Sequence, residues 1–447
     1  MASSGRRIAV LNLTSTHGDP RVLRMGSMLV EMGHEVAVFE MLLPGLSERD
    51  TLKGMQVHRI PVPNRYTDDD MAEIGQTDAH AASVIEQAHP WVYRLPPEAR
   101  PPTTRLGRLA LRAWRKLVPE APSTEPTPAQ SLSKILPIRS IMLVNLAIFR
   151  AAREFAPDIV HCNDLNTMLA GVMLKRALGT KVVYDAHEIY PEQFAPDQRS
   201  EIWHTFYTRL DEQLVHAADA KLTVCDSLGE YFDRTYGAKG FVTVRNLPSL
   251  RQLAPGSVLE RKRERPIVLY HGSYVPFRGL EEMIDAAKFV DGAKFRFRGV
   301  GEHGKTLEAM AKARGMADRI EFVPPVKVEE LVPTASECDV GLSPFVPVCK
   351  NTEFALPNKF FEYLMAGLAC ASSNLVEMQR LTDRHQVGVL FPNQDPRVIA
   401  DSLNALIARP DALAQYRANA LSAARSELNW ETEAQRFRAF YEPLLRV

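Results

Sequence analysis

The chain has 447 residues, which is too long for one ordinary hydrophobic core and predicts two or three domains. Hydrophobic residues make up 45% of the chain and charged residues 24%, as in soluble globular proteins, so a sizeable core can be buried. Lys plus Arg and Asp plus Glu both total 54, which argues against a chain-wide nucleic-acid-binding surface and predicts no nucleic-acid partner.

The cysteines and the apolar runs favour a cytoplasmic protein. Five cysteines are scattered along the chain without a CxxC pair, so we expect a reducing compartment and neither a disulfide framework nor a zinc site. The first apolar run breaks at Asn12 and is interpreted as a β-strand, not as a signal peptide. The longest apolar stretch, 141–149, is far shorter than the roughly 18–20 residues that cross a bilayer.

The first half of the chain alternates strand and helix. Gly33 follows a helical pattern and is placed where a helix is expected to stop. Such alternation predicts a parallel sheet with right-handed crossovers. The predicted strands are 8–13, 35–40, 158–162, 181–185, 221–225 and 242–244, and the predicted helices are 21–32, 167–178 and 202–217.

This alternation is interrupted by a Pro-, Arg- and Ala-rich stretch at 61–140, which we interpret as an insertion that is partly loop. Within it, a helix running from Arg105 to Val118 has apolar residues on one face, among them Trp114, and five cations on the other. Three interpretations stay open: a helix that contacts a membrane surface, a clamp for an anionic acceptor, and an ordinary packed surface helix.

A second α/β unit begins at Pro266, after a charged linker at 251–265. Two doubly wound domains are expected to hold ligands in a cleft at the carboxyl ends of their strands. The predicted strands are 267–271, 293–298, 320–323, 340–343, 368–372 and 387–391, and the predicted helices are 280–289, 305–314, 328–336 and 396–408. A last helix at 430–445 lies beyond the final strand, so we expect residues 429–447 to pack back on the N-terminal domain (1–250) and residues 266–428 to form the C-terminal one.

The segment ALPNKFFEYLMAG at 355–367 carries the most informative pattern. Pro357 suits the first position of a helix, where a missing N–H costs no hydrogen bond. The N-terminus of that helix offers free N–H groups and a partial positive charge to an anion. Glu362 lies about one and a half turns into the helix.

A second pattern, YHGSYVPFRGLE at 270–281, joins a strand to a helix. The strand is predicted to end near Gly272, and a loop then carries Arg278 and Gly279 into the helix. The planar guanidinium of arginine donates two parallel hydrogen bonds to phosphate. Arg278 is therefore a candidate phosphate ligand, and a surface arginine in the same loop is the plainer interpretation.

Two further βα turns carry candidate residues. YDAHEIYPE at 184–192 places His187 and Glu188 directly after a buried strand. THGDPR at 16–21 places Gly18 where glycine permits a close approach between backbone and ligand. Asp19 in that turn is alternatively the N-cap of a helix, with Pro20 at its first position.

Two familiar motifs are given less weight. The segment 299–304 satisfies the dinucleotide fingerprint GxGxxG, but it follows the second strand of its domain and not the first, which argues against a dehydrogenase. Asp68, Asp69 and Asp70 satisfy the DxD pattern of metal-dependent glycosyltransferases, yet they lie in the irregular insertion and fit a helix start.

Taken in order, these segments resemble the retaining glycosyltransferases of family 4, which have two Rossmann-like domains facing across a cleft, the GT-B fold. The resemblance implies that Glu362 receives the ribose hydroxyls of a nucleotide and that His187 lies near the reacting sugar. It implies a donor-sugar and diphosphate site built from Arg278 and the following residues: Gly18, Gly272, Ser273, the backbone N–H groups of Ala355 and Leu356, Asn358 and Lys359. On the acceptor side it implies Asp19, Arg21 and Glu188.

The sequence departs from the family pattern at three positions. Ser273 stands where the family commonly has an arginine, and Arg278 stands where it has a lysine. The first Glu of the family's E-x7-E pattern is replaced by Phe354, and Glu353 lies one position away.

The resemblance implies transfer of a sugar from a UDP- or GDP-sugar to an acceptor hydroxyl with retention of configuration. Sugar, lipid-linked and small-molecule acceptors are all open, within polysaccharide or glycoconjugate biosynthesis. No metal or cofactor is predicted, and the expected location is the cytoplasm, at the inner face of the membrane if residues 105–118 bind it. An inactive binding or scaffold derivative and a sugar-nucleotide epimerase of the same fold are the alternatives.

Overall fold

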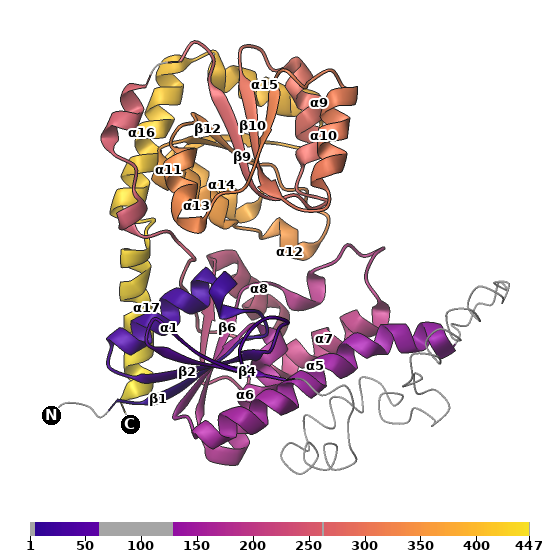
Figure 1. Cartoon of the computed structure of the whole chain (residues 1–447), viewed down its shortest axis with the longest axis vertical. Helices are drawn as coiled ribbons and strands as arrows, with labels where there is room; N and C mark the ends of the chain where they lie inside the picture. Colours follow the sequence, from indigo (N-terminus) through magenta and orange to yellow (C-terminus); the bar gives the residue numbers. More distant parts are fainter. Residues whose placement is uncertain (1–4, 62–127, 262, 447) are drawn as a thin grey trace. The chain divides into compact units, whose positions relative to one another are not determined.

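The computed structural model describes residues 5–61, 128–261 and 263–446 (Figure 1). These residues form two compact units, and the chain passes between them more than once. The first unit holds the described residues up to 186 together with 196–221, and the second holds 187–195 together with the described residues from 222 onward. Each unit is built on a sheet flanked by helices.

An eight-stranded sheet begins the fold, in the order β3-β4-β2-β1-β5-β6-β7-β8. The pairs along β4-β2-β1-β5-β6 are parallel, and β3 pairs antiparallel with β4 at the edge. The strands are β1 (Arg7–Leu11), β2 (Glu35–Met41), β3 (Arg49–Leu52), β4 (Met55–Ile60), β5 (Ile159–Asn163), β6 (Lys181–Ala186), β7 (Ala220–Thr223) and β8 (Phe241–Thr243).

The connecting helices follow the βα pattern that parallel pairing requires. The long α5 runs beside α6, as Figure 1 shows. The helices are α1 (Pro20–Glu31), α5 (Pro128–Phe155), α6 (Leu165–Leu178), α7 (Glu201–Leu214) and α8 (Asp226–Tyr236).

The second sheet has six strands, all parallel, in the order β11-β10-β9-β12-β13-β14. The order reverses direction on either side of β9, so the C-terminal ends of β9 and β12 form a topological switch point, where such folds bind ligands. The strands are β9 (Ile267–Ser273), β10 (Lys294–Val300), β11 (Ile320–Val323), β12 (Val340–Ser343), β13 (Ala369–Ser373) and β14 (Gly388–Phe391).

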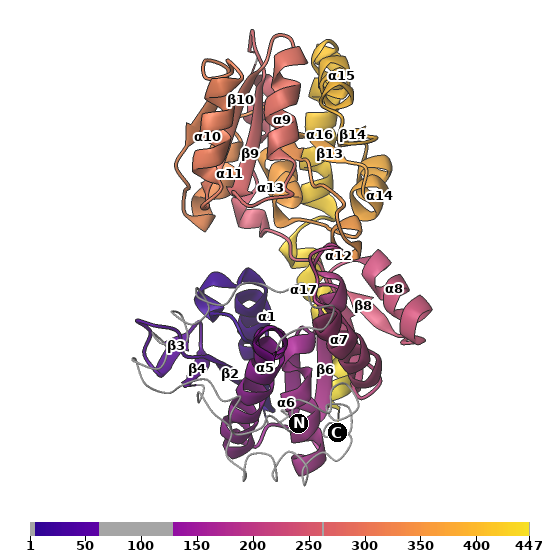
Figure 2. The same ribbon diagram turned by 90° about the vertical axis from the view of Figure 1, so that its right-hand side faces the viewer.

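Helices cover both faces of this sheet (Figure 2). One hydrophobic core joins the sheet to α9, α10 and α15, and another joins it to α11, α13, α14 and α16. The helices are α9 (Leu280–Ala286), α10 (Gly304–Ala313), α11 (Leu331–Ala335), α12 (Lys350–Glu353), α13 (Asn358–Ala366), α14 (Val376–His385), α15 (Pro396–Ile407), α16 (Pro410–Ser426) and α17 (Trp430–Leu445).

Every strand predicted from the sequence is present to within two residues, and β3 and β4 are added. Residues 128–140, assigned above to the insertion, form the first half of α5. Pro357 is the N-cap of α13 and not its first residue, because its ψ of 143° is extended and the helix begins at Asn358. The predicted helix at 105–118 and the aspartates at 68–70 lie outside the described residues. The predicted domain limits and the packing of residues 429–447 stay predictions.

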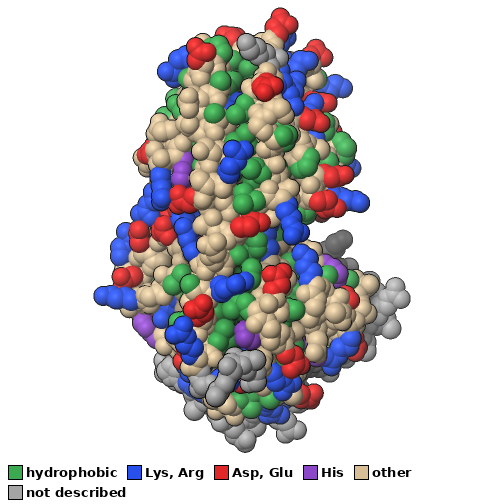
Figure 3. Space-filling view, turned by 90° about the vertical axis from the view of Figure 1, so that its left-hand side faces the viewer, with side chains coloured by type: hydrophobic (Ala, Val, Ile, Leu, Met, Phe, Trp, Pro, Cys, Tyr) green, Lys and Arg blue, Asp and Glu red, His purple; other side chains and the backbone are tan. Residues whose placement is uncertain are grey.

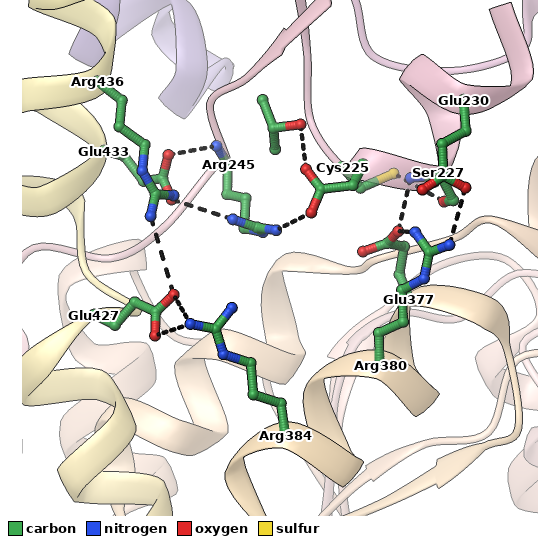
Figure 4. A network of polar contacts seen from close by, with 12 residues as sticks. Cys225, Ser227, Glu230, Arg245, Glu377, Arg380, Arg384, Glu427, Glu433 and Arg436 are labelled. Carbon is green, nitrogen blue, oxygen red and sulfur yellow. Dashed lines mark hydrogen bonds and ion pairs between the residues drawn. The ribbon is translucent and has the colours of Figure 1, made fainter. Parts of the chain in front are cut away.

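A network of charged side chains joins α8 to α14 within the second unit (Figure 4). Glu377, which is 1% exposed, accepts a hydrogen bond from the backbone N–H of Ser227 at 2.8 Å, in the first turn of α8. Arg380 bridges Glu377 and Glu230 at 3.1 and 2.9 Å. A carboxylate at a helix N-terminus is favourable, so this contact fixes the start of α8 against α14.

Charged side chains of both signs are interspersed on the face shown in Figure 3, in keeping with the zero formal charge. Across 5–61, 128–261 and 263–446, no helix is both long enough and apolar enough to cross a membrane.

Candidate functional site

A cavity of about 490 Å³ opens in the second unit at the C-terminal ends of β9 and β12. This is the position that the strand order favours for a ligand. Its wall combines charged, aromatic and small residues, which are His187, Glu188, Val224, Cys225, Leu228, Tyr270, His271, Gly272, Ser273, Arg278, Leu331, Phe345, Asn351, Phe354, Ala355, Leu356, Pro357, Asn358, Lys359 and Glu362.

Arg278 reaches the cavity from the loop between β9 and α9. Its guanidinium carbon lies 4.5 Å from the centre of the Phe345 ring. The loop turns sharply before α9, with Phe277 and Gly279 both in the left-handed region at φ 63° and 72°. Gly279 is also pressed against the chain, because a Cβ built there would lie 1.7 Å from the carbonyl oxygen of Pro344. The glycine therefore fixes the position from which Arg278 projects.

Replacing Gly279 with alanine is expected to destabilise the second unit by several kcal/mol, because the added methyl meets backbone that cannot move aside. Gly315→Ala is the matched control, since Gly315 has nearly the same φ, 69°, but open space around it. The control should lose only the cost of a left-handed alanine, about 1–2 kcal/mol. Unfolding in urea measures the free energy of unfolding of both variants. Equal losses of stability would contradict the explanation that the added methyl meets the backbone of Pro344.

Lys359 is the second cation of the cavity. Its Nζ lies 3.7 Å from the centre of the Tyr270 ring. Gly272, at φ 138°, makes room for it, because a Cβ there would lie 2.8 Å from that Nζ. Burial lowers the pKa of Lys359 well below its ordinary value, and the nearby Arg278 lowers it further, whereas Glu362 acts in the opposite sense. An anionic ligand beside Lys359 would therefore favour the charged form of its side chain.

Within the described residues neither Arg278 nor Lys359 has a carboxylate at ion-pair distance. Both cations instead lie on aromatic rings. An aromatic ring stabilises a cation less than a neighbouring carboxylate would. The repulsion between two neighbouring cations that lack an ion-paired carboxylate favours an anion beside them, although Glu188 and Glu362 line the same cavity.

Glu362 is held by a strand-end histidine. His271 Nε2 lies 2.7 Å from Glu362 Oε2, and the exposed fractions of the two side chains are 2% and 18%. The hydroxyl of Tyr363 accepts a hydrogen bond from the backbone N–H of His271 and donates one to the carbonyl of Leu342, both at 3.1 Å. His271 thus lies against one carboxylate oxygen of Glu362, although its Nε2 makes no hydrogen bond in the described structure, and the partial exposure leaves the carboxylate accessible from the cavity.

His187 and Glu188 line the cavity, and Asn351 holds the start of their segment in place. Its side chain accepts from the backbone N–H of Ile189 at 3.0 Å and donates to Glu188 Oε2 at 3.1 Å. The thiol of Cys349 donates to the carbonyl of Gln193 at 3.5 Å. These contacts explain why a segment that follows β6 belongs to the second unit and brings His187 into the cavity wall.

The GxGxxG segment has a packing role in this arrangement. A Cβ at Gly299 would lie 2.0 Å from the carbonyl oxygen of Gly272, and one at Gly301 would lie 2.2 Å from that of Tyr274. A Cβ at Gly304 would lie 2.9 Å from the Tyr274 ring. The three glycines therefore let the β10–α10 loop pack against the end of β9, which accounts for the motif without a dinucleotide.

The structure brings ten of the residues singled out from the sequence into one cavity wall. They are His187, Glu188, Gly272, Ser273, Arg278, Ala355, Leu356, Asn358, Lys359 and Glu362. One detail was wrong: the Ala355 amide is not available to a ligand, because it donates to the carbonyl of Thr352 at 3.2 Å.

Gly18, Asp19 and Arg21 belong to the first unit. Asp19 is the N-cap of α1 and accepts from the N–H groups of Arg21 and Val22 at 3.0 and 3.2 Å, as its plainer interpretation held. Arg21 is 4% exposed and pairs with Asp185 at 2.5 Å, so its guanidinium is committed within the core. Gly18 has open space around it. Their acceptor and donor roles stay predictions.

Sequence reasoning missed several wall residues, notably Asn351, Phe345 and His271. Phe345 lies in the loop after β12 and Asn351 in the four-residue helix α12, which is too short for a periodic pattern to mark it. His271 immediately precedes Gly272 near the end of β9, and a polar residue near the end of a buried strand was a usable signal.

The departure from the E-x7-E pattern is visible in the wall. Phe354 lines the cavity, whereas Glu353 does not and instead pairs with Lys350 at 2.7 Å. Glu353 thus does not compensate for the replaced carboxylate. Within the described residues there is also no group of three or more His, Cys, Asp or Glu side chains that could hold a metal ion.

Comparison with known proteins identifies the family. Residues 18–247 match the family described as "Glycosyl transferase 4-like domain", and residues 265–409 match "Glycosyl transferases group 1". The curated "Uncharacterized glycosyltransferase YqgM" of Bacillus subtilis is 22% identical over 191 residues, which are 42% of this chain and only 52% of that protein.

Solved structures show the same fold over nearly the whole chain. A sucrose-phosphate synthase from Thermosynechococcus elongatus superposes with a TM-score of 0.70 at 16% identity, covering 98% of this chain and 99% of that one. Anabaena HepE in complex with UDP and glucose gives 0.64 at 13% identity, covering 98% and 100%. Staphylococcus aureus TarM, in a complex that includes UDP, gives 0.64 at 9% identity, covering 98% and 100%. The chain therefore belongs to the family 4-like glycosyltransferases and has their GT-B fold.

Proposed function

We propose that this protein transfers a sugar from a UDP- or GDP-sugar to an acceptor hydroxyl, with retention of the anomeric configuration and without a metal ion. The observation that carries the proposal is the pair of cations, Arg278 and Lys359, that share one cavity without a carboxylate partner among the described residues. A nucleoside diphosphate supplies the negative charge that such a pair lacks.

The chemistry follows from where charge develops. When the bond between sugar and diphosphate breaks, the departing oxygen gains negative charge, and preplaced cations stabilise that charge without rearranging. Arg278 and Lys359 are fixed beforehand, by the Gly279 turn and by the Tyr270 ring. In a retaining reaction the departing phosphate itself can accept the proton of the attacking hydroxyl. No second carboxylate is then required in the cavity wall.

Glu362 is assigned to the ribose hydroxyls, and Glu362→Gln tests this role. A hydrogen bond to a charged group contributes about 1.5–3 kcal/mol, so the affinity for UDP or GDP should fall about 10- to 100-fold. Glu353→Gln is the matched control, because Glu353 lies outside the cavity and is 44% exposed. Calorimetric titration measures both variants, and an unchanged affinity in Glu362→Gln would count against the ribose role.

Phe354 in the cavity wall favours a second candidate, a protein that binds a nucleotide sugar and does not transfer it. The family's carboxylate at this position helps hold the donor sugar, and here an aromatic ring stands in its place. Such a protein would bind UDP or GDP as predicted but release none from a donor sugar.

The deciding experiment supplies UDP- and GDP-sugars with candidate sugar, lipid-linked and small-molecule acceptors and follows release of free UDP or GDP. We expect release that depends on acceptor and persists in EDTA, and a product whose anomeric configuration, read by NMR, matches the donor's. Binding without release in every combination would favour the second candidate. Loss of release in EDTA, or an inverted product, would contradict that part of the proposal.

A further inference from the structure

Four polar residues form a row across the C-terminal ends of neighbouring strands in the second sheet. Arg298 of β10 is the register partner of His271 in β9, and Ser343 of β12 is the partner of Ser372 in β13. The β9–β12 ladder ends at the pair of Leu269 and Gly341, and His271 and Ser343 each lie two residues beyond that pair, on the same face of their strands. Paired residues of adjacent strands share a face, and the contact of His271 with α13 identifies it as the α13 face.

The members of this row are buried, and each has a polar atom without a hydrogen-bond partner in the described structure. Arg298 is 8% exposed, and its Nε and Nη1 are buried without a partner. The orphan atoms of the other three are Nδ1 and Nε2 of His271, Ser343 Oγ and Ser372 Oγ. Unpartnered hydroxyl oxygens also occur elsewhere in the described structure, so the buried guanidinium of Arg298 is the member of the row that indicates a ligand.

Arg298 differs from other buried arginines of the described residues. Arg21 pairs with Asp185, Arg59 with Glu40 at 2.7 Å and Arg417 with Asp339 at 3.5 Å. Arg298 has no hydrogen bond or ion pair to any described residue. Burying an unpaired guanidinium is costly, and a fold tolerates it chiefly where a ligand completes the pairing.

One member of the row, His271, lines the cavity wall, whereas Arg298, Ser343 and Ser372 do not. Arg298 lies on the neighbouring strand, about 4.8 Å from His271 between backbones. Leu331 lines the same cavity and begins α11, the helix that follows β11, and β11 is the strand on the far side of β10. Glu362 and Lys359 lie on α13, which contacts β12 and β13, the strands on the other side of β9 from β10. A nucleotide whose ribose meets Glu362 therefore has the β10 side of the cavity left for its base.

We propose that Arg298 recognises the nucleobase of the donor and selects bases that carry a keto oxygen, uracil or guanine. This inference rests on the proposed function and adds the identity of the base to it. Arginine has only donors, so it pairs with the O4 of uracil or the O6 of guanine. Cytosine and adenine carry an amino group at the corresponding position, which would place donor against donor.

The test compares the binding of UDP, GDP, CDP and ADP to the full chain and to Arg298→Met by calorimetric titration. The unmodified protein should bind UDP or GDP at least about tenfold tighter than CDP and ADP. In Arg298→Met the preferred nucleotide should lose about tenfold or more, and the four affinities should converge to within about threefold. Arg296→Met is the control, because Arg296 lies two residues earlier on the same strand and already pairs with Glu321.

Arg298→Gln gives a second, independent readout, and it also serves if the methionine variant does not fold. Glutamine both donates and accepts, so the gap between UDP and CDP should narrow because CDP binds better. A uniform loss for all four nucleotides, or an unchanged preference in either folded variant, would overturn the role of Arg298. Failure of the unmodified protein to bind any of the four would instead overturn the proposed function, so the two failures are distinguishable.

Discussion

Replacing Arg278 with methionine is expected to lower kcat/KM for sugar transfer by about 10²- to 10³-fold while the second unit stays folded. Removing one preplaced donor from a developing oxyanion costs about 3–4 kcal/mol in comparable sites. Arg278 makes no ion pair with any described residue, so its loss leaves no buried carboxylate uncompensated. The loss should therefore appear in catalysis and not in stability.

The control for this variant is Arg397→Met. Arg397 also lies on an aromatic ring, 4.3 Å from the centre of Phe289, but on α15 and outside the cavity. The substitution Arg397→Met removes the same charge and the same kind of contact with an aromatic ring. The kcat/KM of this variant should therefore stay within about twofold of that of the unmodified protein. Steady-state kinetics with circular dichroism decides the matter, and near-normal transfer by Arg278→Met would rule out its diphosphate role.

Replacing Asp211 with asparagine is expected to stabilise the first unit at pH 7 by up to about 4 kcal/mol. Asp211, on α7, is fully buried, and its Oδ1 accepts from the Tyr184 hydroxyl at 3.1 Å, whereas Oδ2 has no partner in the described structure. Burial raises the pKa of Asp211 to about 8, and the charge of Asp164 adds to this effect. The carboxyl is therefore mostly protonated in the folded protein at neutral pH.

The sign of the pH dependence follows from this raised pKa. Near pH 4 and below, the folded and unfolded states both hold the proton, so the burial carries no titration cost. Between about pH 4 and pH 8 the unfolded chain loses the proton and the folded protein keeps it, so stability falls by about 1.4 kcal/mol per pH unit. The asparagine side chain has no carboxyl proton to titrate, so the free energy of unfolding of this variant should change less with pH over the same range.

Denaturant unfolding at pH 5, 6, 7 and 8 measures this difference. Glu212→Gln is the control, because it removes the same charge from the next residue of α7, which is exposed. Its pH profile should parallel that of the unmodified protein. Identical slopes for Asp211→Asn and the unmodified protein would show that Asp211 does not hold its proton.

The sequence was sufficient for the architecture because alternating strand and helix patterns are local. Strands such as β12 (Val340–Ser343) are short apolar runs bounded by turn signals, and they were predicted to within two residues. The edge strands β3 and β4 were missed because RDTL and MQVHRI mix charge with apolar residues and one face of each is solvated. Whether such segments form strands depends on pairing with residues distant in the chain, which a local pattern does not show.

The candidate site was only partly predictable, because some of its residues are placed by local patterns and others by tertiary packing. Arg278 lies in a βα turn, and Lys359 and Glu362 lie in the first half of the helix α13, so position along the chain indicates position at the sheet edge. Arg298 could not be found this way, because a charged residue within a strand pattern is expected to face solvent. Asp211 lies in the polar run DEQ of an amphipathic helix, and only the packing of α7 reveals that it is enclosed.

The cavity wall is discontinuous in the chain, and this affects how the protein can be dissected. A recombinant fragment that began at residue 251 would keep the second sheet intact. It would still lack five of the twenty wall residues, namely His187, Glu188, Val224, Cys225 and Leu228. It would also lack Ser227, whose amide meets Glu377, and so expose a carboxylate that is enclosed in the whole protein. Weak nucleotide binding by such a fragment would result from the missing wall residues and would not show that the whole protein binds nucleotides weakly.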